Sequence, residues 1–180
     1  MHTYISLLRG INVSGQKKIL MSDLKRLYED LKFKNVRTYI QSGNVVFQYK
    51  KEDAQKLSTT IQQKIFQQYN FDVAIFNITP EDLKEIIINN PFLNQKNIDQ
   101  ERVYVSFLSG VPEQEKIDKL MPFDFAPDSF FIHEKTVYIH CPVSYGNSKL
   151  NNNFFENKLK LVATTRNWKT LLKLKEIAAA

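Results

Sequence analysis

A short internal repeat restricts how this chain can fold more than any other feature of its sequence. Residues 4–10 align with residues 104–110, and four of the seven aligned positions are identical: Tyr, Ser, Leu and Gly. The other apolar positions of the first copy stay apolar in the second. Both copies are rich in residues that favour β-strands, and each precedes a region with helical spacing. The sequence therefore predicts that one strand-first unit has been duplicated.

The expected order of elements supports a duplication. In the first half, the patterns predict strands over 3–8, 35–40, 44–49 and 71–78, a helix over 24–31 capped by Ser22, and a helix over 52–69. After a helix that starts at Pro80, the second half predicts a strand over 102–108, a helix over 112–120, a hairpin of 129–133 and 136–141, and helices over 152–159 and 166–177. We predict an α+β fold of two duplicated ferredoxin-like βαββα halves with antiparallel or mixed sheets, and domains at 1–90 and 91–180.

Composition fits a folded, non-membrane protein. The chain has 180 residues and is 43% hydrophobic, which is enough for a sizeable core. No apolar run approaches the roughly 18 residues that a membrane span needs. Cys141 is the only cysteine, so no intramolecular disulfide can form. These features predict a cytoplasmic location.

Two polar clusters are expected on one edge of the first sheet. Arg9-Gly10-Ile11-Asn12 follows the first strand, and Gln41-Ser42-Gly43-Asn44 forms the turn of the first hairpin. In a split βαβ unit the third strand lies between the first two and runs antiparallel to them, so the end of the first strand meets this turn.

The chemistry of the two clusters suits an anion. Arg9 offers a fork of donors, Asn12, Gln41 and Asn44 both donate and accept, and the loop leads into a helix N-terminus. The sequence predicts a site for a small phosphate- or carboxylate-bearing ligand, with Arg9 as its charge partner. Asn12, Gln41, Ser42 and Asn44 would orient the ligand.

The repeat itself favours a functional role for this edge. Aligning Tyr39-Ile40 with Phe131-Ile132 places Gln41 to Asn44 opposite His133 to Thr136, and Arg9 falls opposite Ser109. Residues that only build a repeated scaffold are expected to recur, whereas this cation and these amides do not. The alternative is that Gly43 and Asn44 serve the turn alone, since Asn and Gly are common turn residues.

Arg166 is a further candidate ligand contact. The stretch from Thr164 to Trp168 resembles a helix start with Thr165 as its cap, which puts Arg166 near the positive end of the helix dipole. An arginine at that place suits an anion. The alternative is that Arg166 pairs internally while Trp168 and Leu171 form a buried stripe.

Several long stretches together resemble the bacterial DUF1697 family. They are Tyr4 to Val13, Arg37 to Phe47, Asn90-Pro91-Phe92 and Thr164 to Trp168. The resemblance covers essentially the whole chain and implies a duplicated ferredoxin-like α+β fold. It implies no reaction, cofactor or catalytic residue. Ser14-Gly15 stands where the family often has a Gly-Gly pair.

Two other functions stay open on the sequence. A nucleic-acid-binding module would use the basic C-terminal residues, which are Lys158, Lys160, Arg166, Lys169, Lys173 and Lys175, although the RNA-recognition signature is missing. An enzyme of unknown reaction would use the same edge as the anion. No phosphate-loop, dinucleotide or metal-ligand spacing occurs, so we expect no cofactor and no metal. We expect no membrane partner.

Overall fold

The computed structural model describes all residues from 1 to 180, and their contacts form two compact units. The first unit contains Met1–Glu85 together with Lys173–Ala180, and the second contains Ile86–Leu172. Each unit holds one four-stranded antiparallel sheet with helices, so the predicted α+β fold of two similar halves is confirmed. The domain division at residue 90 remains a proposal.

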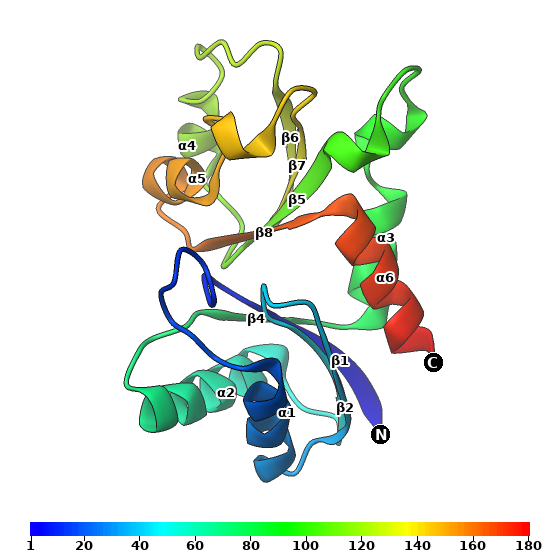
Figure 1. Ribbon diagram of the computed structural model, residues 1–180. Helices are drawn as coiled ribbons and strands as arrows, with labels where there is room; N and C mark the ends of the chain where they lie inside the picture. The colour runs from blue at the N-terminus through cyan, green and yellow to red at the C-terminus, as the bar shows by residue number, and fades with distance from the viewer. The chain divides into compact units, whose positions relative to one another are not determined.

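The sheet of the first unit has the strand order β2-β3-β1-β4 (Figure 1). Its strands are β1 (His2–Leu8), β2 (Lys34–Tyr39), β3 (Asn44–Tyr49) and β4 (Ile75–Ile78). β1 pairs with both β3 and β4, and Leu7 lies opposite Asn44 in the register. β3 therefore lies between β1 and β2, as the split βαβ order predicts.

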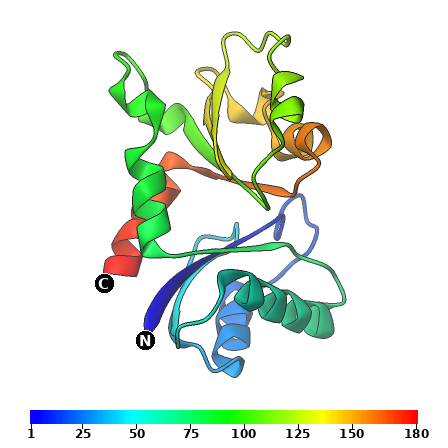
Figure 2. The ribbon, with the colours of Figure 1, turned by 180° about the vertical axis from the view of Figure 1, so that it is seen from behind.

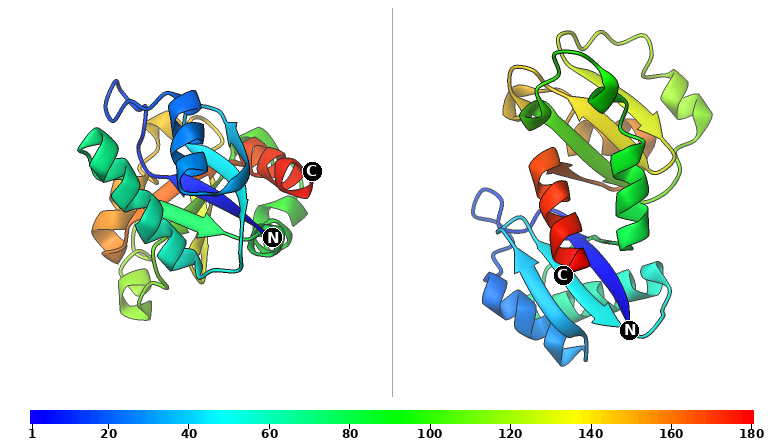
Figure 3. Two further views of the ribbon diagram at one scale, coloured as in Figure 1. Left: turned by 90° about the horizontal axis from the view of Figure 1, so that it is seen from below. Right: turned by 90° about the vertical axis from the view of Figure 1, so that its right-hand side faces the viewer.

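Helices α1 (Met21–Asp30) and α2 (Ala54–Tyr69) cover one face of this sheet (Figures 2 and 3). Because strand side chains alternate, Tyr4 and Leu8 of β1 point to the same face, where they join the core. The helices contribute Leu24, Leu27 and Tyr28 from α1 and Leu57, Ile61 and Ile65 from α2. These are the apolar stripes that the helical spacing predicts.

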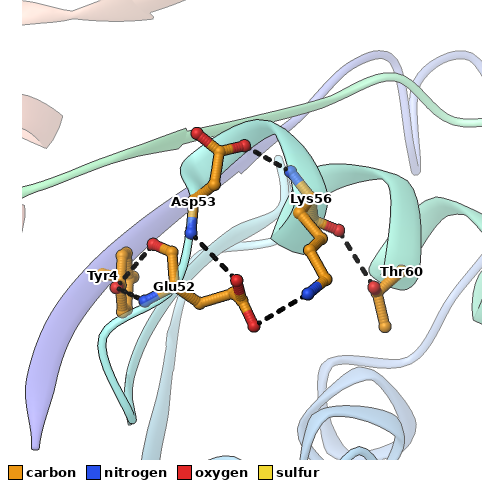
Figure 4. A network of polar contacts seen from close by, with 5 residues as sticks. All are labelled: Tyr4, Glu52, Asp53, Lys56 and Thr60. Atoms are coloured by element: carbon orange, nitrogen blue, oxygen red, sulfur yellow. Dashed lines mark hydrogen bonds and ion pairs between the residues drawn. The ribbon is translucent and has the colours of Figure 1, made fainter.

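The start of α2 is held by a small polar network (Figure 4). The carboxylate of Asp53 accepts a hydrogen bond from the Lys56 N–H at 2.9 Å, which caps the helix. The Tyr4 hydroxyl donates to the Glu52 carbonyl and accepts from the Glu52 N–H, both at 2.9 Å. This network fixes α2 to the central strand. The start of α1 is different: it has no side-chain cap, so the predicted capping role of Ser22 is wrong.

The second unit repeats the same strand order, β6-β7-β5-β8. Its strands are β5 (Val103–Leu108), β6 (Ser129–His133), β7 (Thr136–His140) and β8 (Ala163–Asn167), and its helices include α4 (Gln114–Asp118) and α5 (Asn152–Leu159). Its core combines Leu108, Val137, Ile139 and Ala163 of the sheet with Phe155 and Leu159 of α5.

The predicted helix start at Thr165 is wrong. Residues 163–167 form β8, which pairs with β5 and completes a second βαββαβ unit. The β-branched Thr164 and Thr165 suit this sheet position. Helix α6 (Trp168–Ala179) follows directly, and the Asn167 side chain accepts the hydrogen bond from the Thr170 N–H at 2.8 Å.

Helix α3 (Pro80–Ile88) begins where the sequence predicts. The Thr79 hydroxyl oxygen accepts from the Asp82 N–H, and the Asp82 carboxylate accepts from the Thr79 N–H, which forms a reciprocal cap. Among all the helices, none combines the length and the apolar character that a membrane crossing requires.

Candidate anion-binding edge of the first unit

The loop after β1 folds into a small hairpin, Ile11–Ile19, which we call the finger. Its two arms are joined by the Asn12 N–H donating to the Lys17 carbonyl at 3.2 Å and by the Gln16 N–H donating to the Val13 carbonyl at 2.9 Å. Ser14 and Gly15 form the tip with φ of 50° and 74°. Two consecutive positive φ angles match the tight turn of a two-residue hairpin.

Asn12 closes the base of the finger and ties it to the first hairpin turn. Its side-chain NH₂ donates to the carbonyls of Ile19 at 2.9 Å and Gln41 at 3.0 Å. Its side-chain oxygen accepts from the Ile19 N–H at 2.9 Å. The whole amide of Asn12 is therefore engaged within the protein.

The first hairpin turn, Ile40–Gly43, packs tightly against the finger and β1. The Leu8 N–H donates to the Gly43 carbonyl at 2.8 Å. A β-carbon at Gly43 would lie 2.8 Å from the Leu8 Cβ and from the Ile11 Cδ1, and the φ of Gly43 is 82°. Only glycine fits both the conformation and the contact.

Asn44 fixes the turn from inside. Its side chain is fully buried, and its NH₂ donates to the Tyr39 carbonyl and to the Ser42 hydroxyl oxygen, both at 3.0 Å. Gln41, in contrast, has an exposed side chain at the top of the turn.

Arg9 is half-buried at the end of β1, next to both elements. Its N–H donates to the Ala74 carbonyl at 2.9 Å, which holds the backbone in line with β4. Gly10, which follows Arg9, is partly exposed, whereas Ile11 is fully buried. The finger adds two exposed cations, Lys17 and Lys18. The Lys17 ammonium donates a hydrogen bond to the Asp72 carbonyl at 2.5 Å.

Five of the six predicted site residues thus lie on one edge of the first sheet: Arg9, Asn12, Gln41, Ser42 and Asn44. Arg166 belongs to the second unit and does not lie at a helix start. It is 6% exposed on β8, and its guanidinium donates to the Thr164 hydroxyl and the Thr165 carbonyl, both at 2.9 Å. Its role in binding stays a prediction.

The corresponding edge of the second unit provides a built-in comparison. The Leu108 N–H donates to the Lys135 carbonyl at 2.8 Å and the Ser109 N–H to the Val162 carbonyl at 2.9 Å. These bonds repeat those of Leu8 and Arg9, so the alignment of residues 4–10 with 104–110 holds in space. Ser109 accepts a hydrogen bond from the Val162 N–H at 2.9 Å and replaces the cation.

The two hairpin turns differ in length. Tyr39 pairs with Asn44 across Ile40–Gly43, whereas His133 pairs with Thr136 across Glu134-Lys135 alone. The first turn is therefore two residues longer, and Tyr39 corresponds to His133, not to Phe131 as the ungapped alignment predicts.

The finger was not predicted from the sequence, although the loop contains Asn and Gly, which favour the positive φ angles of a tight turn. Asn12, Ser14 and Lys17 have φ of 56°, 50° and 44°, and Ile40 in the neighbouring turn has φ of 48°. Asn and Gly in the loop favour such angles, but a β-branched residue at positive φ is rare. Unfavourable backbone conformations that persist often mark functional sites.

The basic residues of the C-terminal region do not form one stripe. Arg166 is buried on β8, and the Lys158 ammonium lies 4.7 Å from the centre of the Phe123 ring. On α6, Lys173 pairs with Glu176 at 2.6 Å. Nucleic-acid binding by this region stays a prediction. These contacts count against it.

Reactive side chains are not prominent. Burial raises the pKa of the Cys141 thiol, which favours its unreactive protonated form. No group of three or more His, Cys, Asp or Glu side chains lies together in a way that could hold a metal ion.

Comparisons with known proteins identify a family and a solved structure that are similar to this chain. A family model described as "Protein of unknown function (DUF1697)" matches residues 1–138. Among solved structures, the conserved bacterial protein SP0830 from Streptococcus pneumoniae is similar with a TM-score of 0.76 and 22% sequence identity, over 98% of each chain. At this identity the likeness establishes the fold alone. The comparison with curated proteins gave no match.

Proposed function

The chain belongs to the DUF1697 family, whose function is unknown, and we propose that it binds a small anionic ligand at the edge formed by the finger and the first hairpin turn. The chain's own residues support this proposal. The ligand carries a phosphate or carboxylate group. Arg9 is its charge partner, because a guanidinium recognises either group with a planar fork of donors.

One observation carries this proposal: the backbone bonds of Leu8 and Arg9 have counterparts at Leu108 and Ser109, but the two edges differ in the polar residues and loops around those bonds. The first has Arg9, the finger and the longer turn, whereas the second has Ser109, no finger and a two-residue turn. A duplicated scaffold needs none of these additions, since the second unit folds without them.

The residues of this edge take two roles, which follow from their chemistry and position. Arg9 and the exposed Gln41 side chain contact the ligand, together with the N–H group of the partly exposed Gly10. Asn12, Ser42 and Asn44 hold the finger and the turn in place, because their side chains bond within the protein.

Thermal unfolding with added ligand tests the proposal. Inorganic phosphate, citrate and a panel of phosphorylated and carboxylated metabolites should raise the Tm of the wild type relative to chloride at equal ionic strength. A ligand at about ten times its Kd adds about 1.4 kcal/mol. The matched control is Arg26→Ala, an arginine on α1 whose only ion pair is with Asp23 at 4.0 Å.

The variants make the result specific. Arg9→Ala should abolish the ligand-induced rise in Tm, Gln41→Ala should reduce it, and Arg26→Ala should leave it unchanged. Each rise is measured against the same variant without ligand, so a loss of stability in Arg9→Ala does not mimic a loss of binding. Equal rises in the wild type and Arg9→Ala would contradict the proposal.

A further inference from the structure

A second candidate surface lies on the second unit, at the outer edge of β6, and it is independent of the proposed anion site. β6 pairs with β7 on one side only, so the N–H and C=O groups on its other side have no neighbouring strand (Figure 1). Such an edge is a template for a further strand unless the protein protects it.

The equivalent edge of the first unit is protected and β6 is not. β2 carries Lys34 and Arg37, a register shift between them, and Asn35 with φ of 50°. These features blunt an edge against strand pairing. β6 reads Ser-Phe-Phe-Ile-His, with no Lys, Arg or Pro, and its pairing with β7 is unbroken from Ser129 to His133.

An open hollow of mixed polar and apolar lining adjoins the start of β6. Its volume is about 280 Å³, and its apolar lining comes from Leu120, Met121, Phe123, Phe125 and Phe130. Met121 is 65% exposed and Phe123 is 47% exposed, and on the other face of β6 Phe131 is 50% exposed. Large apolar side chains gathered around an open edge are typical of an interaction surface.

Acidic side chains outnumber basic ones around this edge, where the cations are Lys135 in the turn after β6 and Lys158, whose ammonium lies over Phe123. Asp124 and Asp128 line the same hollow, and Glu134 follows the end of β6. Residues 91–143 contain eight acidic and five basic residues, although the whole chain carries a net charge of +6. A partner that matches this edge therefore combines apolar side chains with a basic one.

We propose that the outer edge of β6 binds an extended peptide segment of another protein, which adds as a fifth strand to the second sheet. The main-chain bonds of β6 hold the segment, an apolar side chain enters the hollow, and a flanking Lys or Arg lies against Asp124 and Asp128. This is recognition by strand addition, in which the backbone supplies affinity and the pockets supply specificity.

Fluorescence anisotropy with a labelled peptide of the sequence Lys-Thr-Val-Tyr-Ile-His tests this directly. The peptide copies residues 135–140, which contain the strand that already pairs with β6. Two further peptides carry N-methyl groups, one on Val and Ile and the other on Thr, Tyr and His. Because alternate N–H groups face a neighbouring strand, strand addition predicts that only one of the two methylated peptides loses binding.

Protein variants locate the binding. Phe131→Lys and Ser129→Lys each place a charge on the edge at an exposed position and should weaken binding by at least about tenfold, or 1.4 kcal/mol. Val111→Lys adds the same charge at a residue that is 63% exposed in a loop of the same unit and should change nothing.

Four outcomes overturn the proposal: no saturable binding, equal loss with both methylated peptides, equal binding by the edge variants and the wild type, or self-association of the wild type that Phe131→Lys abolishes in sedimentation. The last would assign the edge to a second copy of this chain.

Discussion

Gly43 is the residue on which the geometry of the candidate anion site depends most directly. Its φ of 82° disfavours any residue with a side chain, and an added β-carbon would lie only 2.8 Å from the Leu8 Cβ and the Ile11 Cδ1. Both facts exclude a side chain at this position. We expect Gly43→Ala to lower the free energy of unfolding by about 2–4 kcal/mol, since strain and overpacking add. Urea titration measures the loss. Gly15→Ala, whose β-carbon would meet only Lys18 Cε at 3.9 Å, should cost less, and equal losses would contradict this account.

Ser6 and Ser106 occupy the same place in the two repeats but differ in hydrogen bonding. The Ser6 hydroxyl donates to the Asn77 side-chain oxygen, and the Asn77 NH₂ donates in turn to Ser58 on α2 at 3.0 Å. The Ser106 hydroxyl is buried without a partner. We expect Ser6→Ala to lower the free energy of unfolding by about 1 kcal/mol and Ser106→Ala to raise it by about as much. Chemical denaturation of both variants would show opposite signs, and losses of equal size would contradict the assignment.

Among the larger elements, the finger depends on a single side chain. Asn12→Ala removes three hydrogen bonds, which join the finger to itself and to the first turn. We expect the Ile19 amide, which loses its acceptor, to exchange with solvent much faster, and the unfolding free energy to fall by about 1–3 kcal/mol. Hydrogen exchange measures the first effect. Asn35→Ala, which removes one exposed bond to Gln48, is the matched control and should leave exchange in the finger unchanged. Unchanged exchange at Ile19 would show that other contacts hold the finger.

Helices and strands whose signals lie within their own sequence were predicted well. The strand β8, whose conformation depends on pairing with a distant strand, was not. The bounds of α5 and β3 agree with the sequence patterns, because helical spacing and capping by Asn151 are local features. β8 was missed because Thr164 to Asn167 also reads as a helix start. Its strand conformation comes from pairing with β5, which lies far earlier in the chain. The shared edge of Arg9 and the first turn was predictable, since it follows from strand order alone. The internal bonds of Asn12 and Asn44 were not, because they depend on the backbone of the loops.

At the scale of the whole molecule, two buried phenols make stability depend on alkaline pH. Burial raises the pKa of Tyr138 to about 12 and also raises that of Tyr28. An unfolded tyrosine titrates near pH 10, so above that value the unfolded state binds fewer protons than the folded state. The free energy of unfolding should therefore be constant with respect to these groups below about pH 10 and should fall as the pH rises above about 10.

The variant Tyr138→Phe tests this dependence. It should lower stability at pH 8, because the Tyr138 hydroxyl donates to the Ile86 carbonyl at 2.9 Å. It should also make the fall above about pH 10 shallower, since one titrating group is gone. Urea titrations at about pH 8 and pH 11 provide both values. A fall as steep as that of the wild type would mean that other groups control alkaline unfolding.

The grouping of residues Lys173–Ala180 with the first unit has a consequence for synthesis on the ribosome. The second unit is one continuous stretch, Ile86–Leu172, so all of its residues have been synthesised before translation reaches residue 173. The first unit starts earlier but gains its last residues only afterwards. Domains that emerge from a ribosome fold as their residues become available. In this chain the unit that begins first is thus the one completed last, and a nascent chain released after Leu172 would carry a full second unit beside an unfinished first one.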